Sequence, residues 1–176
     1  MKEQLIKQKL INILKNDFEI IEKISGTHYT GKQVKPDFAF RLPSDKRLFI
    51  VEIKDDTAIN FNLTELIRQT INYKSATYDG VIPTFAFFTT YNLLKGISLP
   101  IENAKMLGLA AKLGVGQIHS KIDYDQSLIR IGIGNIFLFT YNILTCESAL
   151  NFTDLKSENI GTKAASNRLS NNIEPV

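Results

Sequence analysis

Residues 35–56, "KPDFAFRLPSDKRLFIVEIKDD", decide the fold, because two apolar, β-type runs surround a short cluster of turn-forming residues. The cluster "PSDK", residues 43–46, predicts a loop between two antiparallel strands. If this loop pairs Leu42 with Arg47, every further pair of the hairpin is fixed. Three charged residues interrupt the apolar runs and need a physical explanation: Asp37, Glu52 and Lys54.

The predicted register separates the side chains of the hairpin by face. Asp37 lies opposite Glu52, and Lys54, two residues further along its strand, points the same way. The side chains that point the other way are apolar: Phe38, Phe40, Phe49, Val51 and Ile53. One face is therefore predicted to be core and the other to carry the chemistry. In the alternative interpretation the three charges are a strand start and a solvated stripe, but Ala39 and Ile50 on the same face argue against full exposure.

Two neighbouring carboxylates about 5 Å apart repel each other, and in a half-buried place a cation would relieve that repulsion. Mg²⁺ is the predicted cation, with Mn²⁺ as a second option, because one or two carboxylates together with water and substrate phosphate satisfy its coordination. A metal held in this way stabilises charge on a phosphodiester and lowers the pKa of a bound water. Lys54 is predicted either to orient or deprotonate the attacking water, if its pKa is lowered, or to stabilise the charge of the transition state.

Pro36-Asp37 followed by Glu52-Ile53-Lys54 resembles the signature of the PD-(D/E)XK, or restriction endonuclease-like, nuclease superfamily. Gln69 and Tyr73, four residues apart on a predicted helix, resemble the Q-x-x-x-Y element of its RecB-like branch. In the alternative interpretation these two are ordinary helix surface. The resemblance implies that the catalytic residues are Asp37, Glu52, Lys54, Gln69 and Tyr73.

The resemblance also implies a set of metal ligands, formed by Asp37, Glu52 and the backbone carbonyl of Ile53. A further ligand often comes from a first-helix Glu in this superfamily. Glu3 is the best candidate, because helical spacing puts it on the apolar stripe with Leu10 and Leu14. Glu19 and Glu22 are weaker candidates.

The pattern along the chain predicts an α/β (mixed α+β) fold, with a central mixed sheet flanked by helices. The resemblance implies that this sheet and its helices form a restriction endonuclease-like core. The predicted domain spans residues 1–150, and the polar tail, residues 151–176, is expected to be partly disordered or to pack only on a partner. The predicted helices are residues 2–16, from Asn62 or Thr64 to about 78, and 101–113. The predicted strands outside the hairpin are 18–26, 83–91 and a closing pair in 117–125 and 128–139, with "GTHYTGKQ", residues 26–33, as a loop.

Composition limits the function classes. The formal net charge is +3 with a pI near 8.9, which permits nucleic-acid binding without arguing for it. Cys146 is the single cysteine, so a disulfide framework is excluded and a reducing, intracellular (cytoplasmic) setting is expected. The N-terminal residues lack the apolar core of a signal peptide, and no apolar stretch is long enough to predict a membrane span.

These observations predict a Mg²⁺-dependent DNA endonuclease of the restriction, homing or mobile-element, or branched-DNA type. Its DNA phosphates would contact a basic rim formed by Lys32, Lys35, Arg41, Arg68 and Lys74. Cleavage of both strands of a symmetric site would call for a homodimer or homotetramer. Three alternatives stay open: an exonuclease or repair nuclease of the RecB-like type, a non-catalytic nucleic-acid-binding protein on the same fold, and an unrelated α+β protein. His119, in a late strand, is predicted to be structural.

Overall fold

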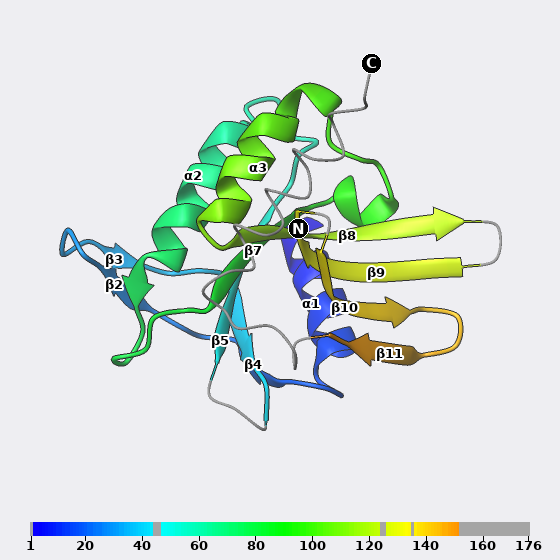
Figure 1. Ribbon diagram of the computed structural model, residues 1–176, viewed down its shortest axis with the longest axis horizontal. Coiled ribbons are helices and arrows are strands. Elements are labelled where there is room, and N and C mark those ends of the chain that lie inside the picture. Colours follow the sequence, from blue (N-terminus) through cyan, green and yellow to red (C-terminus); the bar gives the residue numbers. More distant parts are fainter. Residues whose placement is uncertain (1, 44–46, 124–125, 135, 152–176) are drawn as a thin grey trace, which may run out of the picture.

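The hairpin forms two central strands of a mixed sheet in the computed structural model, which describes residues 2–43, 47–123, 126–134 and 136–151 (Figure 1). Strand β4 (Phe38–Arg41) pairs antiparallel with β5 (Leu48–Lys54). Phe38 faces Val51 and Ala39 faces Ile50, so the predicted register is confirmed. The tip, residues 44–46, lies outside the described residues.

The main sheet has eight strands, in the order β1-β4-β5-β7-β8-β9-β10-β11. The pairs β5–β7 and β7–β8 are parallel, and all other neighbours are antiparallel. The strands beyond the hairpin are β1 (Glu19–Ile21), β7 (Phe85–Thr90), β8 (Val115–Asp123), β9 (Gln126–Ile133), β10 (Ile136–Asn142) and β11 (Glu147–Leu150). A second, three-stranded sheet consists of β2 (Gly26–His28), β3 (Gln33–Val34) and β6 (Ala76–Thr77), in the order β3-β2-β6.

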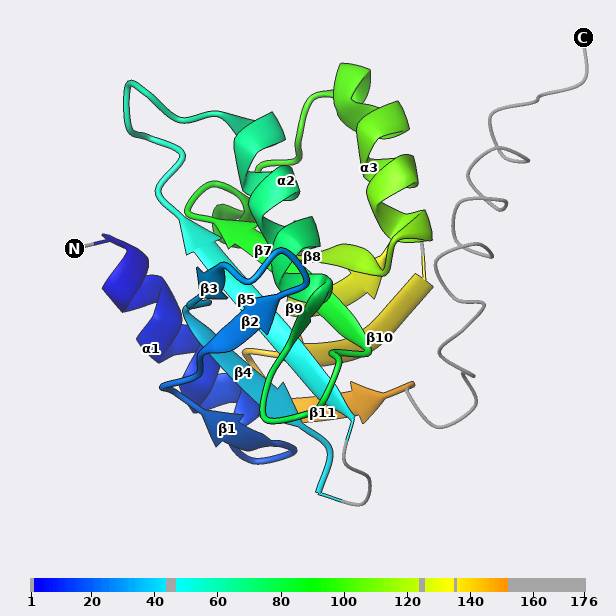
Figure 2. The same ribbon diagram turned by 90° about the vertical axis from the view of Figure 1, so that its left-hand side faces the viewer.

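Helices cover both faces of the main sheet (Figure 2). Helix α1 (Lys2–Leu14) packs on one face, and α2 (Leu63–Lys74) and α3 (Ala104–Lys112) pack on the other. Two short 3₁₀ helices, η1 (Leu93–Lys95) and η2 (Ile101–Asn103), lead into α3. None of the helices in the described part of the chain is long and apolar enough to cross a membrane. The predicted class, a mixed sheet flanked by helices, is confirmed.

Two hydrophobic cores lie on opposite faces of the sheet. The first joins α1 to the apolar face of the hairpin and to the late strands, since Leu10, Phe40 and Ile131 belong to one cluster. The second lies under α2 and α3 and contains Ala39 and Ile50. The prediction that only one hairpin face is core is therefore wrong: the face with Glu52 and Lys54 is also packed, and its charged residues lie at one end of that packing.

Several element boundaries differ from the predictions. The strand predicted over 18–26 is confined to β1, and the loop predicted over 26–33 contains β2 and the first residue of β3. The second of the predicted closing strands is two strands, β9 and β10, separated at Gly134, whose φ of 61° only glycine adopts easily. Helix α2 ends at Lys74 rather than near 78, because β6 begins two residues later. Of the predicted tail, residues 152–176 lie outside the described residues.

Candidate active site

The backbone of the hairpin holds Asp37 and Glu52 beside each other. The Asp37 N–H donates to the Val51 carbonyl at 3.2 Å, and the Asp37 Oδ2 accepts from the Ile53 N–H at 2.7 Å. Glu52, between those two residues, has a side chain that is only 3% exposed. The structure therefore brings the two predicted carboxylates together, one of them buried.

The environment of Glu52 favours its neutral form. Burial, and then the neighbouring charge of Asp37, raise the pKa of Glu52 to about 7. A hydrogen bond and the positive charge of Lys54 act in the opposite direction without outweighing these effects. An added positive charge nearby would favour the charged form of this carboxyl.

Lys54 completes the charged group. Its Nζ lies 2.8 Å from the Glu52 Oε1, and its side chain is 36% exposed. Burial acts to lower the pKa of Lys54, but the hydrogen bond and charge of Glu52, with further contributions from Glu3 and Asp37, leave that pKa raised. The condition for Lys54 to deprotonate a water, a lowered pKa, is therefore not met.

Helix α2 brings the other two predicted catalytic residues to the same place. The Gln69 Nε2 donates to the Tyr73 Oη at 2.6 Å, and that hydroxyl donates to the Lys35 carbonyl at 3.4 Å, just before the acidic strand. Burial raises the pKa of the Tyr73 hydroxyl, and the charge of Glu52 raises it as well. Tyr73 therefore lies close enough to Glu52 for the charge of that carboxylate to affect the pKa of its hydroxyl.

Helix α1 contributes two polar side chains that hold the ends of the hairpin. The Glu3 Oε1 accepts from the Asp55 N–H at 3.1 Å, one residue beyond Lys54. Lys7 donates from Nζ to the Asp37 carbonyl at 2.6 Å. Sequence analysis missed Lys7, although its position four residues after Glu3, on the same stripe of the helix, was a usable signal.

The oxygen donors present fit a hard divalent cation. Within the described ranges, no group of three or more His, Cys, Asp or Glu side chains is arranged to hold a metal ion. Glu3 is therefore not gathered with the two hairpin carboxylates. Of the weaker candidates, Glu19 lies 3.8 Å from the Arg41 Nε, and Glu22 is exposed and lines a groove with Asp37.

The predicted basic rim is divided by the fold. Lys32, Lys35 and Arg68 line a groove of about 430 Å³, together with Gln69 and Tyr73. Arg41 lies at the other end of its strand from Asp37 and lines a different pocket with Tyr78 and Asp79. Lys74 lies beside Gly114 and is half-buried, which lowers its pKa. Three of the five predicted cations thus share a groove with the catalytic candidates, and two do not.

No protein-family model, curated protein or solved structure matches this chain. The candidate site is therefore characterised by its own geometry. That geometry combines a buried acid, a neighbouring carboxylate, a lysine in contact with the buried acid, and an adjoining basic groove.

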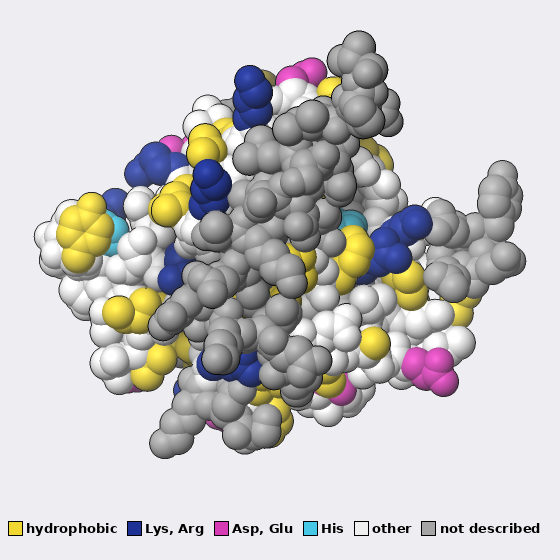
Figure 3. Space-filling model, in the orientation of Figure 1, with side chains coloured by type: hydrophobic (Ala, Val, Ile, Leu, Met, Phe, Trp, Pro, Cys, Tyr) yellow, Lys and Arg dark blue, Asp and Glu magenta, His cyan; other side chains and the backbone are white. Residues whose placement is uncertain are grey.

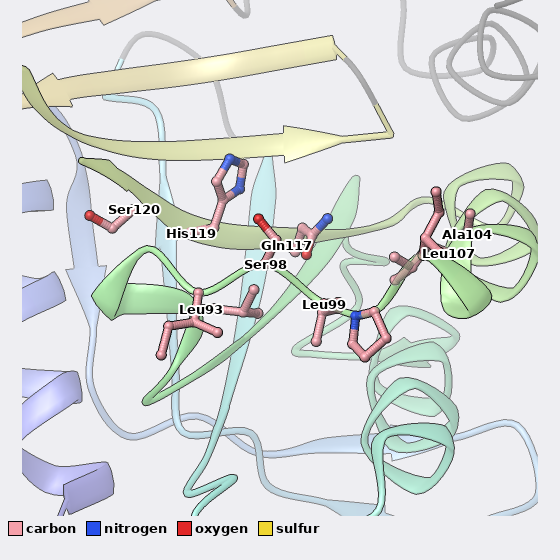
Figure 4. A pocket seen from close by; sticks show the side chains of 11 residues that line it. Leu93, Ser98, Leu99, Ala104, Leu107, Gln117, His119 and Ser120 are labelled. Carbon is pink, nitrogen blue, oxygen red and sulfur yellow. The ribbon is translucent and has the colours of Figure 1, made fainter. Parts of the chain in front are cut away.

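A second pocket, of about 240 Å³, lies between the η1–α3 segment and strand β8 (Figure 4). Leu93, Leu99 and Leu107 form apolar parts of its wall, and Gln117 and His119 contribute polar side chains. The His119 Nδ1 is buried and has no hydrogen-bond partner among the described residues. Burial, and then the charge of Arg130, lower the pKa of His119. None of the hairpin carboxylates lines this pocket.

Proposed function

We propose that this protein is a Mg²⁺-dependent deoxyribonuclease that hydrolyses DNA phosphodiester bonds, acting as an endonuclease. The observation that carries the proposal is the pairing of Asp37 with the buried Glu52, which is itself 2.8 Å from the Lys54 ammonium. Two carboxylates so placed are costly without a bound cation. A site that needs a divalent cation and adjoins a basic groove is suited to a phosphodiester substrate.

The arrangement of elements supports a restriction endonuclease-like core. Along the chain, α1 precedes β1, β4 and β5, and α2 connects β5 to β7. The first three strands are antiparallel neighbours, and β7 pairs parallel to β5. Helix, three strands, helix, strand is the order that the resemblance to the PD-(D/E)XK superfamily implies.

Each residue has a separate task in the proposed site. Mg²⁺, or Mn²⁺ in its place, held by Asp37, Glu52 and the Ile53 carbonyl, would stabilise charge on the phosphate and activate water. The Lys54 ammonium would add a positive charge beside the reacting phosphate. Gln69 orients the Tyr73 hydroxyl through their 2.6 Å hydrogen bond, which fixes the side of the site that faces the groove.

One observation favours a second activity within this class. The hydrogen bond between Gln69 and Tyr73 supports the assignment of the Q-x-x-x-Y element to the RecB-like branch. That assignment favours an exonuclease or repair nuclease that acts at DNA ends. Cleavage of linear DNA with no nicking of closed circular plasmid would select this alternative over the endonuclease.

The test compares wild-type protein with Asp37→Asn, Glu52→Gln and Lys54→Met on supercoiled plasmid, linear duplex, single-stranded and branched DNA. Each reaction contains Mg²⁺, Mn²⁺ or EDTA. Lys112→Met, an exposed lysine on α3, is the matched control. Metal-dependent cutting that falls at least a hundredfold in the three site variants and persists in the control supports the proposal. DNA binding without cutting, equal in all five proteins, would instead identify a non-catalytic binding protein, and light scattering of the same samples would detect a dimer or tetramer.

A further inference from the structure

The β2–β3 hairpin projects from the molecule next to α2 (Figure 1). Its turn is closed by two backbone hydrogen bonds, from the His28 N–H to the Lys32 carbonyl at 2.9 Å and from the Gly31 N–H to the His28 carbonyl at 2.8 Å. The φ of Gly31, 85°, is the left-handed conformation that glycine permits. Strand β2 also pairs with β6, which follows α2 directly. The turn is thus ordered, and its strand β2 is joined through β6 to the end of α2, the helix that carries Gln69 and Tyr73.

The turn exposes an aromatic ring. Tyr29 is 84% exposed, whereas the other tyrosines that the structure describes are buried or half-buried. Its ring centroid lies 4.0 Å from that of His28. Figure 3 shows hydrophobic and histidine side chains together at the outer end of this hairpin. A tyrosine ring held in solvent by an ordered turn is available for stacking on a flat partner.

Basic side chains line two grooves between the turn that carries Tyr29 and the Asp37 carboxylate. The groove between the hairpin and α2 contains His28, Lys32, Lys35 and Arg68, with Glu65 as its acidic member, bound to Arg68. A second groove, of about 470 Å³, contains Lys7, Lys23 and Lys35 and ends at Asp37, with Glu22 as its other acidic member. Lys35 lines both grooves, which therefore lie next to each other. A chain of phosphates is complementary to such grooves.

We propose that the β2–β3 hairpin is a binding site for single-stranded DNA, in which Tyr29 stacks on an unpaired base while Lys32, Lys35 and Arg68 contact the adjoining phosphates. This inference rests on the proposed nuclease function, since it names the form of DNA that the site takes. An aromatic ring stacks on the face of a base, which a single strand exposes and the interior of a duplex hides. Because every base has such a face, the binding is expected to be insensitive to sequence.

The experiment measures Kd by fluorescence anisotropy in EDTA, with a labelled 20-nucleotide single strand and with the duplex of the same sequence. Tyr29→Ala should weaken single-strand binding about five- to a hundredfold, the range for the loss of one stacked base. Tyr29→Phe, which keeps the ring, should bind within twofold of wild type. Leu109→Ala, an exposed apolar residue on α3, is the matched control and should bind as wild type does.

The salt dependence of the binding constant distinguishes the contribution of base stacking from that of phosphate contacts. Replacing Lys35 by Gln should make the slope of log K against log salt less steep by about 0.7, the value for one phosphate contact on a single strand. Tyr29→Ala should leave that slope unchanged. The proposal is overturned if Tyr29→Ala binds as wild type does, if Tyr29→Phe loses as much affinity as Tyr29→Ala, or if duplex binding weakens equally.

Measuring binding without metal distinguishes this inference from the nuclease proposal. Cleavage that persists while Tyr29→Ala leaves the Kd unchanged overturns the stacking site alone. Single-strand binding that depends on Tyr29, with no cleavage of any DNA, overturns the nuclease activity alone. Thermal unfolding of each variant checks that the exposed substitution leaves the fold intact.

Discussion

Glu52 is the residue whose environment departs furthest from that of a carboxylate in water. It faces Phe88 on the neighbouring parallel strand, and Asp37 lies on its other side. Burial and that second carboxylate raise its pKa from the usual 4.5 to about 7. The neutral acid is therefore the form that the folded protein tolerates in the absence of a cation, and this has consequences for stability that can be measured without any substrate.

Glu52→Gln is expected to stabilise the metal-free protein at pH 8 but not at pH 5. Because the folded pKa lies above the unfolded one, the advantage of the neutral acid is complete below about pH 4.5 and is lost as the pH rises through about 7. At pH 8 the wild type carries a penalty of about 3 kcal/mol that a neutral glutamine avoids. Urea unfolding in EDTA at both pH values measures the difference. The exposed Glu102→Gln is the control, and an equal effect of Glu52→Gln at the two pH values would contradict the explanation.

Mg²⁺ should offset the loss of stability that the charged Glu52 causes in the wild type, and should stabilise Glu52→Gln much less. A ligand that binds the folded state and not the unfolded one raises the melting temperature as its concentration rises above Kd. At pH 8, millimolar Mg²⁺ is expected to raise the melting temperature of the wild type by several degrees, and of Glu52→Gln by much less. Differential scanning fluorimetry with a Mg²⁺ series and an EDTA baseline checks this, and equal shifts in both proteins would place the metal elsewhere.

Sequence alone could predict the three hairpin residues, because strand alternation and loop length fix which side chains share a face. Sequence alone could not predict which of the basic residues lie near the carboxylates. That depends on where each residue lies along its strand and on which side of its helix. Arg41 is four residues along its strand from Asp37, at the far end of the hairpin. Lys74 follows Gln69 by five residues, which is about 140° further round a helix. Lys7 shares a helix stripe with Glu3, but its partner is a backbone carbonyl thirty residues away in sequence, so the stripe alone does not identify this contact.

At the scale of the element, α2 was predictable and the β2–β3 hairpin was not. Asn62 caps α2 by accepting from the Glu65 N–H at 3.2 Å, a signal that is visible in the sequence. Strands β2 and β3 have only three and two residues. Isolated strands of that length are unstable, so they depend on pairing with β6, which lies after α2 in the chain. Local patterns cannot reveal a partner that distant.

Removing the cap of α2 should weaken the fold measurably. Asn62→Ala leaves the Glu65 N–H without its side-chain acceptor, and we expect a loss of about 1 kcal/mol in the free energy of unfolding. Asn62→Asp keeps the acceptor and should stay close to wild type. Urea unfolding of the two variants measures the difference. Equal stability of Asn62→Ala and Asn62→Asp would show that solvent replaces the cap at no cost.

At the scale of the whole molecule, one core joins the early and late parts of the chain. The core beneath α1 contains residues of the β4–β5 hairpin together with Ile131 and Phe139 from the late strands, so the sheet curls around it. Among the described strands, β7 and β8 lie between the β4–β5 hairpin and the late strands β9, β10 and β11 in the sheet. Sequence analysis predicted a closing pair of strands here, but strand order depends on pairings between distant segments, which a local pattern does not specify. A shared core implies that both parts unfold together.

Two glycine substitutions are expected to change the free energy of unfolding in opposite directions. The first, in β8, tests the connection between the two parts of the sheet, and the second, in α3, provides a comparison. A Cβ on Gly116 of β8 would collide with the backbone carbonyl oxygen of Gly132 on β9, and backbone cannot move aside as a flexible side chain can. We expect Gly116→Ala to lower the free energy of unfolding by about 2 kcal/mol or more, in a single transition, because both parts of the sheet share one core. A Cβ added to Gly108 of α3 would meet no other part of the protein within 4 Å, so Gly108→Ala should raise stability by about 0.5 to 1 kcal/mol through helix propensity. Urea unfolding followed by circular dichroism and by tyrosine fluorescence measures both. Two separate transitions in Gly116→Ala would show that the late strands fold independently of the β4–β5 hairpin, and unchanged stability would show that β8 and β9 can separate locally without cost.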